Sequence, residues 1–347
     1  MYITDLSAIS PQKTFNEEIL DGEFISRQDK KFLVIEPDYM EFIPKGLLRR
    51  MGKAVRMGIG ASLPLIKSHK DIDGVLVGTA NGGLEDCIKF LNQIVEYDEG
   101  MLTPTNFVQS TPNAIAGQVA LMGAKRGYNI TYTNGGLAFE NALLDALLLF
   151  EEKHNKLLIG GVEEISDYNY NIDFLAGKFK DELIADHELI ASNTKGTYCG
   201  EGASFFVLES QANEYLCQIL DVAQITYPNI EDLDIIAKDL LKQNNLNISD
   251  IDSIILGYNG DIRHNSFYDY VGESIFPNAN QYYFKHLTGD FRNCSSIGLW
   301  LLAHLIKGND HLETSMNYKK KNDKKLKNVL LYNHFDANRH SFILVRR

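Results

Sequence analysis

Two cysteines and two histidines are the residues of this chain best suited to nucleophilic chemistry. Cys199 and Cys294 carry thiols, Cys294 follows shortly after Asp290, and His264 and His286 supply imidazoles. A histidine that takes the thiol proton would make either cysteine a nucleophile for acyl transfer or thioester hydrolysis. The alternative is that the cysteines pack in the core and the histidines make local hydrogen bonds. The sequence leaves both interpretations open.

A turn without a reactive side chain is the second feature of chemical interest. The run Asn129-Ile-Thr-Tyr-Thr-Asn-Gly-Gly-Leu-Ala-Phe-Glu-Asn-Ala predicts a strand that breaks into a helix. A cysteine at the start of such a helix would have a lowered pKa, because the helix dipole stabilises its thiolate. Here the turn holds Gly135 and Gly136, and glycine also permits the positive φ of a tight turn.

Composition limits the classes of function. The chain has 347 residues, 44% of them hydrophobic and 23% charged, with a net charge of −12. The excess of acid disfavours binding to nucleic acid or to an anionic membrane, both of which attract basic patches. The sequence contains neither a long uninterrupted apolar run nor the basic and apolar start of a signal peptide, so we expect a cytoplasmic protein without a membrane span.

The four cysteines are widely spaced. They include no Cys-x-x-Cys pair, which argues against a disulfide framework or a zinc site, and we expect neither a metal nor a cofactor.

Short β-rich runs alternate with amphipathic helices, the pattern of a layered α/β protein. The first half contains predicted strands at Met1–Ser10, Gly74–Thr79, Asn129–Thr133, Lys156–Gly160 and Ala203–Glu209, and predicted helices at Pro44–Ile66, Leu84–Tyr97, Asn113–Gly123 and Leu137–Lys153. The second half contains predicted strands at Tyr215–Ile225, Ile251–Tyr258, Tyr282–His286, Val329–Tyr332 and Ser341–Val345, and predicted helices at Ile230–Lys242, Ser266–Ile275 and Ser295–Lys307. The similar order predicts two structurally duplicated halves, residues 1–210 and 211–347, in one compact unit.

Five further segments are more informative together than alone. In chain order they are Tyr2-Ile-Thr-Asp-Leu-Ser-Ala-Ile-Ser-Pro, Gly78-Thr-Ala-Asn-Gly-Gly-Leu, Thr105-Asn-Phe-Val-Gln-Ser-Thr-Pro-Asn-Ala-Ile-Ala-Gly-Gln-Val-Ala-Leu, Gly161-Val-Glu-Glu and Gly200-Glu-Gly-Ala-Ser-Phe-Phe-Val-Leu-Glu. This ordered set resembles the β-ketoacyl-acyl-carrier-protein synthases of the thiolase superfamily and covers nearly the whole chain. The resemblance implies a thiolase-like fold, with two pseudo-duplicated βαβαβαββ halves in a five-layer α-β-α-β-α arrangement.

The resemblance also implies where the catalytic side chains of an active ketosynthase would stand. Aligning Asn129-Ile-Thr with the family's strand puts Gly136 at the position of the nucleophilic cysteine, whereas counting back from Gly160-Gly161 puts Gly135 there. Either alignment removes the nucleophile, because glycine cannot carry an acyl group.

The two catalytic histidines of the family are also replaced. Asn259 stands at the first histidine position, with Asp261 close behind it, and Asp290 stands at the second. The family's lysine is retained as Lys285, and Phe335 matches the loop that gates the pocket, although the glycines of that loop are gone. The added carboxylates would oppose catalysis unless cations pair with them.

The cations that could pair with these carboxylates are Lys285 and Arg263. Lys285 is either a catalytic remnant or the ion-pair partner of Asp290.

A ketosynthase-like chain without catalytic residues resembles the chain-length factors, which pair with an active synthase and shape the pocket for a growing polyketide, polyene or fatty-acid-like chain. Its compact length is similar to subunits of aryl-polyene or flexirubin-type pathways. This chain departs from the chain-length factors of aromatic polyketide systems, which tend to have glutamine at the cysteine position, because it has glycine there. We therefore expect a non-catalytic pseudoenzyme in a heterodimer, with no independent activity.

The resemblance implies that an active ketosynthase binds through Thr105–Thr133, where an edge strand and an apolar helix could bury a large area. The acidic acyl carrier protein would dock mainly on that partner, because this chain is itself acidic. Two alternatives stay open. One is an acyltransferase or thioester hydrolase that uses a relocated Cys199 or Cys294, and the other is a homodimeric acyl-binding or scaffold protein.

Overall fold

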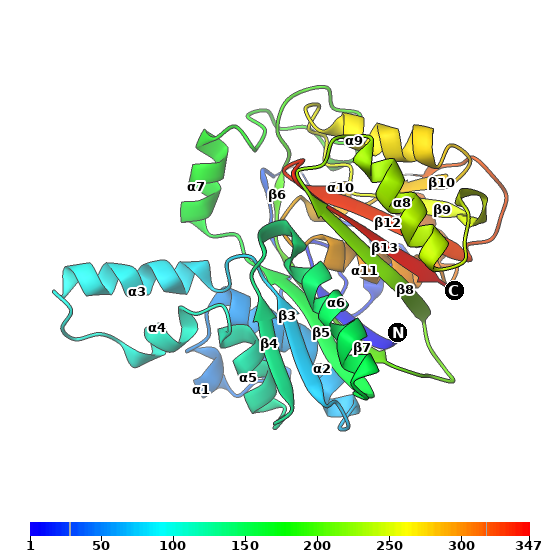
Figure 1. Cartoon of the computed structure of the whole chain (residues 1–347). Coiled ribbons are helices and arrows are strands. Elements are labelled where there is room, and N and C mark those ends of the chain that lie inside the picture. The colour runs from blue at the N-terminus through cyan, green and yellow to red at the C-terminus, as the bar shows by residue number, and fades with distance from the viewer. Residues whose placement is uncertain (28, 317) are drawn as a thin grey trace.

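Two sets of five strands with the same order form the framework of the protein in a computed structural model that describes residues 1–27, 29–316 and 318–347 (Figure 1). The first set consists of β1 (Tyr2–Ile9), β3 (Gly74–Gly78), β4 (Tyr128–Tyr132), β5 (Lys156–Glu163) and β7 (Gly202–Glu209), in the order β4-β3-β5-β7-β1. The second consists of β8 (Cys217–Thr226), β9 (Ser253–Leu256), β10 (Asn280–Tyr283), β12 (Asn328–Phe335) and β13 (Arg339–Arg346), in the order β10-β9-β12-β13-β8.

Strand directions repeat as well. The second strand of each set, β3 or β9, is parallel to its two neighbours, and the remaining pairs in each set are antiparallel. This confirms the predicted duplication. The sets meet where Tyr2 pairs with Gln218 and Ile3 with Cys217, and β11 (Tyr318–Lys319) extends the far edge. We propose that the boundary between the halves lies in the connection 210–216, between β7 and β8.

Helices cover both outer faces and fill the space between the two sets. The outer helices are α2 (Lys53–Ser68) and α5 (Ala114–Met122) on the first set, and α8 (Asp232–Gln243), α9 (Asn265–Asp269) and the π-helix η6 (Tyr270–Ile275) on the second. Between the sets lie α6 (Ala138–Glu151) and α11 (Ser295–Leu305), whose side chains share one buried cluster with residues from both sets. The predicted five-layer arrangement is therefore confirmed.

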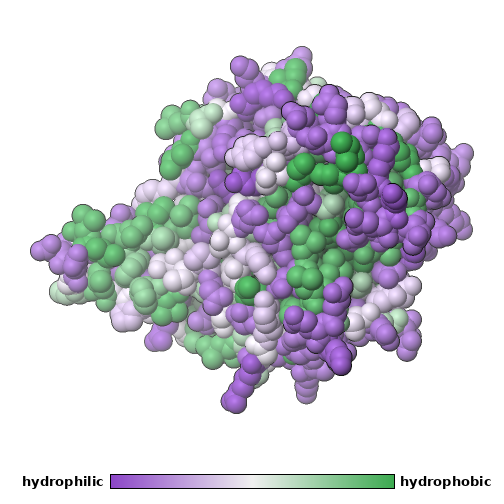
Figure 2. Space-filling view, in the orientation of Figure 1, coloured by the Kyte–Doolittle hydropathy of each residue, from purple (hydrophilic) through white to green (hydrophobic). Residues whose placement is uncertain are grey.

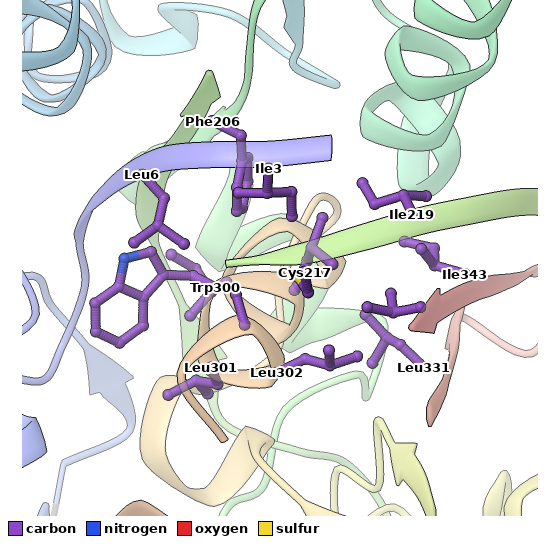
Figure 3. Packing of buried hydrophobic residues seen from close by; sticks show 14 of the residues in the cluster. Ile3, Leu6, Phe206, Cys217, Ile219, Trp300, Leu301, Leu302, Leu331 and Ile343 are labelled. Carbon is purple, nitrogen blue, oxygen red and sulfur yellow. The ribbon is translucent and has the colours of Figure 1, made fainter. Parts of the chain in front are cut away.

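Helix α11 illustrates why the central layer forms. Nearly every residue of the sequence Ser-Ser-Ile-Gly-Leu-Trp-Leu-Leu-Ala-His-Leu is buried, as expected for a helix that is apolar on all sides. Figure 3 shows Trp300, Leu301 and Leu302 among residues from both strand sets. Helix α6 packs in the same buried cluster as α11, and this packing fixes the position of its first turn, which follows the glycine pair.

Most of the remaining elements are short, except helix α3, and most border the site or the surface. They are α1 (Lys45–Leu48), α3 (Leu84–Glu96), α4 (Pro104–Gln109), α7 (Asp167–Leu175), α10 (Lys285–Thr288), α12 (Asp310–Ser315), the 3-10 helices η1 (Glu18–Asp21), η2 (Tyr39–Glu41), η3 (Gly135–Leu137), η4 (Asp186–Glu188) and η5 (Ile248–Asp250), and the parallel pair β2 (Lys31–Phe32) and β6 (Cys199–Gly200). Within the described ranges, no helix is long and apolar enough to cross a membrane.

Two predicted elements are wrong in extent. The single helix expected over Pro44–Ile66 is divided into α1 and α2, because the chain is extended at Gly52 and glycine favours helix poorly. The strand expected over Tyr282–His286 ends at Tyr283, and helix α10 begins at Lys285. The apolar run Tyr-Tyr-Phe hides this change of structure in the sequence.

Candidate functional site

The glycine turn lies where β4 leads into α6, as the sequence predicts. Gly135 has φ 50°, a left-handed conformation that favours glycine. Gly136 follows in a buried turn, and a Cβ atom built on it would lie 2.3 Å from Phe335 Cβ. Real Cβ contacts are never this short. Phe335 therefore fills the space that a side chain at position 136 would need.

Phe335 is held in this place by charged neighbours. The Arg292 guanidinium lies 5.3 Å and the Lys178 ammonium 5.8 Å from the centre of its ring, within the range of cation–π attraction. Asp173 pairs with both cations at 3.3 Å, and Lys178 also pairs with Asp336 at 3.3 Å. The phenylalanine is thus part of an ordered cluster over the glycine turn.

The two positions that correspond to catalytic histidines are bonded to each other. Asn259 donates from Nδ2 to Asp290 Oδ2 at 2.7 Å, and Lys285 Nζ lies 2.8 Å from Asp290 Oδ1. Lys285 also donates to the carbonyl of His334 at 3.3 Å. Burial alone would lower the pKa of Lys285, but the adjacent Asp290 carboxylate outweighs it and raises that pKa above its usual value. The predicted ion pair between Lys285 and Asp290 is present.

Arg263 neutralises the other carboxylate. Its Nε donates to Asp261 Oδ1 at 2.9 Å. Burial would raise the pKa of Asp261, yet hydrogen bonds from Arg263 hold it below its usual value. Asp290 is therefore paired with Lys285 and Asp261 with Arg263, the two cations that the sequence analysis named as possible partners.

A pocket opens beside this network and encloses about 690 Å³, including solvent at its mouth. Its lining brings together these residues that the sequence analysis singled out: Asn259, Asp261, Asp290, Phe335, Cys199 and His264. Lys285 is fully buried behind Asp290, and the glycine turn is covered by Phe335. The pocket wall thus combines bonded polar groups with the aromatic rings of Tyr170, Phe179, Phe291 and Phe335, and it has no reactive group at the turn.

Sequence reasoning missed Glu163, a buried carboxyl group at the end of β5 that lines the pocket. It accepts hydrogen bonds from Asn293 Nδ2 at 2.6 Å and from the Thr79 hydroxyl at 3.3 Å. Burial raises its pKa to about 7. The block Gly161-Val-Glu-Glu had marked this segment, but it gave no indication that the carboxyl group is buried.

The two candidate thiols have unfavourable surroundings for nucleophilic chemistry. Cys199 lines the pocket, but burial and nearby carboxylates raise the pKa of its thiol above the usual range. Cys294 is fully buried, and burial raises its pKa to about 12. His264 reaches the pocket, whereas His286 Nε2 lies 2.7 Å from the carbonyl of Ser315. No hydrogen bond within the described parts of the chain joins either cysteine to either histidine.

Residues 1–27, 29–316 and 318–347 contain no group of three or more histidine, cysteine, aspartate or glutamate side chains placed to hold a metal ion.

Comparison with known proteins shows what this chain is similar to. Residues 26–174 match the family profile described as the N-terminal domain of β-ketoacyl synthase. The structure described as the ishigamide ketosynthase/chain length factor has a TM-score of 0.79 over 99% of this chain and 98% of that chain, at 14% identity. The protein has a ketosynthase fold. The expected thiolase-like architecture is confirmed.

Two further structures have the same fold. A β-ketoacyl synthase from Burkholderia phymatum STM815 has a TM-score of 0.76 at 16% identity, over 100% of this chain and 98% of that chain. A ketosynthase (ApeO) in complex with its chain length factor (ApeC) from Xenorhabdus doucetiae has a TM-score of 0.75 at 16% identity, over 99% and 97% of the two chains. No curated protein sequence matches this ketosynthase-like chain.

Proposed function

We propose that this chain is a non-catalytic, chain-length-factor-type subunit that pairs with an active β-ketoacyl-acyl-carrier-protein synthase. The observation that carries the proposal is the contact at the glycine turn, where Phe335 lies in the space that a side chain on Gly136 would occupy. A ketosynthase needs a thiol at this turn to hold the acyl chain during condensation. This turn has neither the thiol nor room for one.

The replacements at the histidine positions support the same conclusion. Asn259 cannot serve as an acid or base near neutral pH. Asp290 is ion-paired with Lys285 and hydrogen-bonded to Asn259, so its carboxylate already has partners. Charge that develops on a reacting thioester would meet a carboxylate here instead of a hydrogen-bond donor. In this proposal the bonded group of Asn259, Asp290 and Lys285 has a structural role, and the partner carries out the condensation.

The proposed binding surface for that partner is the segment Thr105–Thr133. It contains most of α4, all of α5 and strand β4, which ends the sheet beside β3. An edge strand presents unpaired backbone groups that another chain can bind. Phe107 and Leu121 are large apolar residues exposed in the same segment. Together these features match an interface core that a second subunit would bury.

Structures of the same fold provide examples of such partners. One is described as a ketosynthase with its chain length factor, and another, AntDE:AntF, as a type II acyl carrier protein in complex with its ketosynthase. For this chain we propose an active ketosynthase as the direct partner, with the carrier protein docking mainly on that ketosynthase because this chain has a net charge of −12. We place this complex in the cytoplasm.

The product class is a narrower part of the proposal. The chain aligns with 98% of the ishigamide protein but only 71% of a modular ketosynthase from the bacillaene synthase. We propose a polyene or polyketide product, including those of the aryl-polyene and flexirubin-type pathways, and the likeness of fold to the ishigamide ketosynthase/chain length factor supports this.

The enzyme alternative requires a relocated thiol. The raised pKa values of Cys199 and Cys294 leave little thiolate near neutral pH, so the structure gives no support to a hydrolase or acyltransferase that uses them. Labelling of one cysteine by an acyl-thioester probe, with matching loss of activity, would establish that alternative. A homodimeric acyl-binding protein would instead self-associate and retain ligand without turnover.

Co-purification with candidate ketosynthases tests the proposal. The complex is then assayed for condensation with malonyl-loaded carrier protein, using a partner that either has or lacks its active cysteine. We expect a stable complex whose activity depends wholly on the partner's cysteine. A stable monomer that binds no ketosynthase of its own pathway would contradict the proposal.

A further inference from the structure

Helices α3 and α4 form an arm, residues 84–109, that projects on the side of the molecule where the sheet ends in β4 (Figure 1). Its root is fixed, because the Glu85 amide donates to the Glu164 carboxylate at 3.1 Å and the Ser166 hydroxyl donates to the Glu85 carboxylate at 2.7 Å. The rings of Phe90 and Phe107 lie 5.5 Å apart and hold the two helices together. The arm is therefore a defined helical hairpin.

The outer half of the arm is apolar and exposed. Leu91 and Val95 lie one turn apart on the same face of α3, and Val95 is 84% exposed. Met101, in the segment between the helices, is 86% exposed. Figure 2 shows apolar side chains gathered on this projection. A concentration of exposed large apolar residues marks an interaction surface, because a free chain rarely leaves so many in water.

The tip of the arm adds charge and a fixed shape. Glu96, Asp98 and Glu99 place three carboxyl groups next to the apolar stripe. Asp98, Glu99 and Met101 have φ values of 48°, 63° and 46°, which residues other than glycine adopt uncommonly. The chain therefore maintains a specific bend at the tip, and the carboxyl groups there would complement a basic surface.

We propose that the outer part of the arm, residues 91–101, is a clasp that packs on the ketosynthase partner and extends the interface beyond the segment Thr105–Thr133. This inference rests on the proposed function, since the partner must lie along the β4 edge for the arm to reach it. A chain bound at that edge meets the arm directly, because the arm projects past the edge. Leu91, Val95 and Met101 would contact apolar residues of the partner, and the acidic tip would face its basic residues.

A comparison of two serine double variants tests the clasp. Val95→Ser with Met101→Ser removes the apolar surface of the arm. Ile172→Ser with Leu175→Ser removes two exposed apolar residues from α7, where Ile172 is 66% and Leu175 is 86% exposed. Circular dichroism should show both variants folded, because none of these side chains is buried. The dissociation constant for the purified active ketosynthase is then measured by analytical ultracentrifugation.

We expect the arm variant to bind at least about tenfold more weakly than the wild type, because burial of one such side chain accounts for about that factor. The α7 variant should bind within about twofold of the wild type. Equal affinities for both variants would overturn the clasp and leave the proposed function intact. Failure of the wild-type chain to bind any ketosynthase would overturn the proposed function, and the clasp with it.

Discussion

Removing the charge of Asp290 should destabilise the protein strongly. The substitution Asp290→Asn keeps the shape of the side chain but leaves the Lys285 ammonium, which is fully buried and lies 2.8 Å from the carboxylate, without a counter-charge. Loss of one partner of a buried ion pair costs about 3–5 kcal/mol, because the remaining charge is desolvated and unpaired. We expect the free energy of unfolding to fall by about 3 kcal/mol or more, measured by urea denaturation.

Two further variants complete this test. Asp234→Asn breaks the surface pair with Lys238, 2.6 Å long on α8, and should cost less than about 1 kcal/mol. Adding Lys285→Met to Asp290→Asn removes the stranded charge and should restore much of the lost stability. Similar small losses for Asp290→Asn and Asp234→Asn would refute the view that the former catalytic positions now form a structural network.

Three other changes have expected outcomes. Gly136→Cys should lower the midpoint of urea unfolding and give no condensation activity, because its Cβ would overlap Phe335; turnover by that variant alone would contradict this expectation. Burial lowers the pKa of His286 and of His340 from 6.5 to about 4, so these groups favour the folded state above pH 6.5, and unfolding titrations should show stability falling as the pH drops from 6.5 towards 4. The pKa of Glu163 is raised by burial, so this group acts in the opposite direction: it stabilises the folded state below pH 4.5, and that stabilisation is lost as the pH rises towards 7. Glu163→Gln should therefore remove this loss of stability between pH 4.5 and 7. The same dependence of stability on pH in the variant and the wild type would contradict this expectation.

The sequence predicted features that depend on local patterns. Gly135 and Gly136 sit at a strand-to-helix turn because a β-rich run, two glycines and a helical stripe follow each other directly. The pair Lys285 and Asp290 was predicted because Lys285 stands at the family's lysine position, a few residues before a carboxylate that needs a counter-charge. The duplicated halves followed from the repeated order of strands and helices.

Contacts between distant residues were not predictable in this way. Phe335 covers Gly136 from the other half of the chain, and no local pattern predicts that a ring fills the nucleophile's place. The bond between Asn259 and Asp290 and the burial of Glu163 likewise depend on how the strand sets pack together. The first helix of the arm was predicted over Leu84–Tyr97, but α4 was not predicted, and the projection of the arm past β4 is a property of the folded structure.

The most direct test of the central claim is a condensation assay of the purified complex in which only the partner's active-site cysteine is changed. The account predicts that the complex assembles with either form of the partner, and that product formation disappears completely when that cysteine is replaced. Continued product formation by the cysteine-free complex would show that this chain supplies its own nucleophile and would contradict the account.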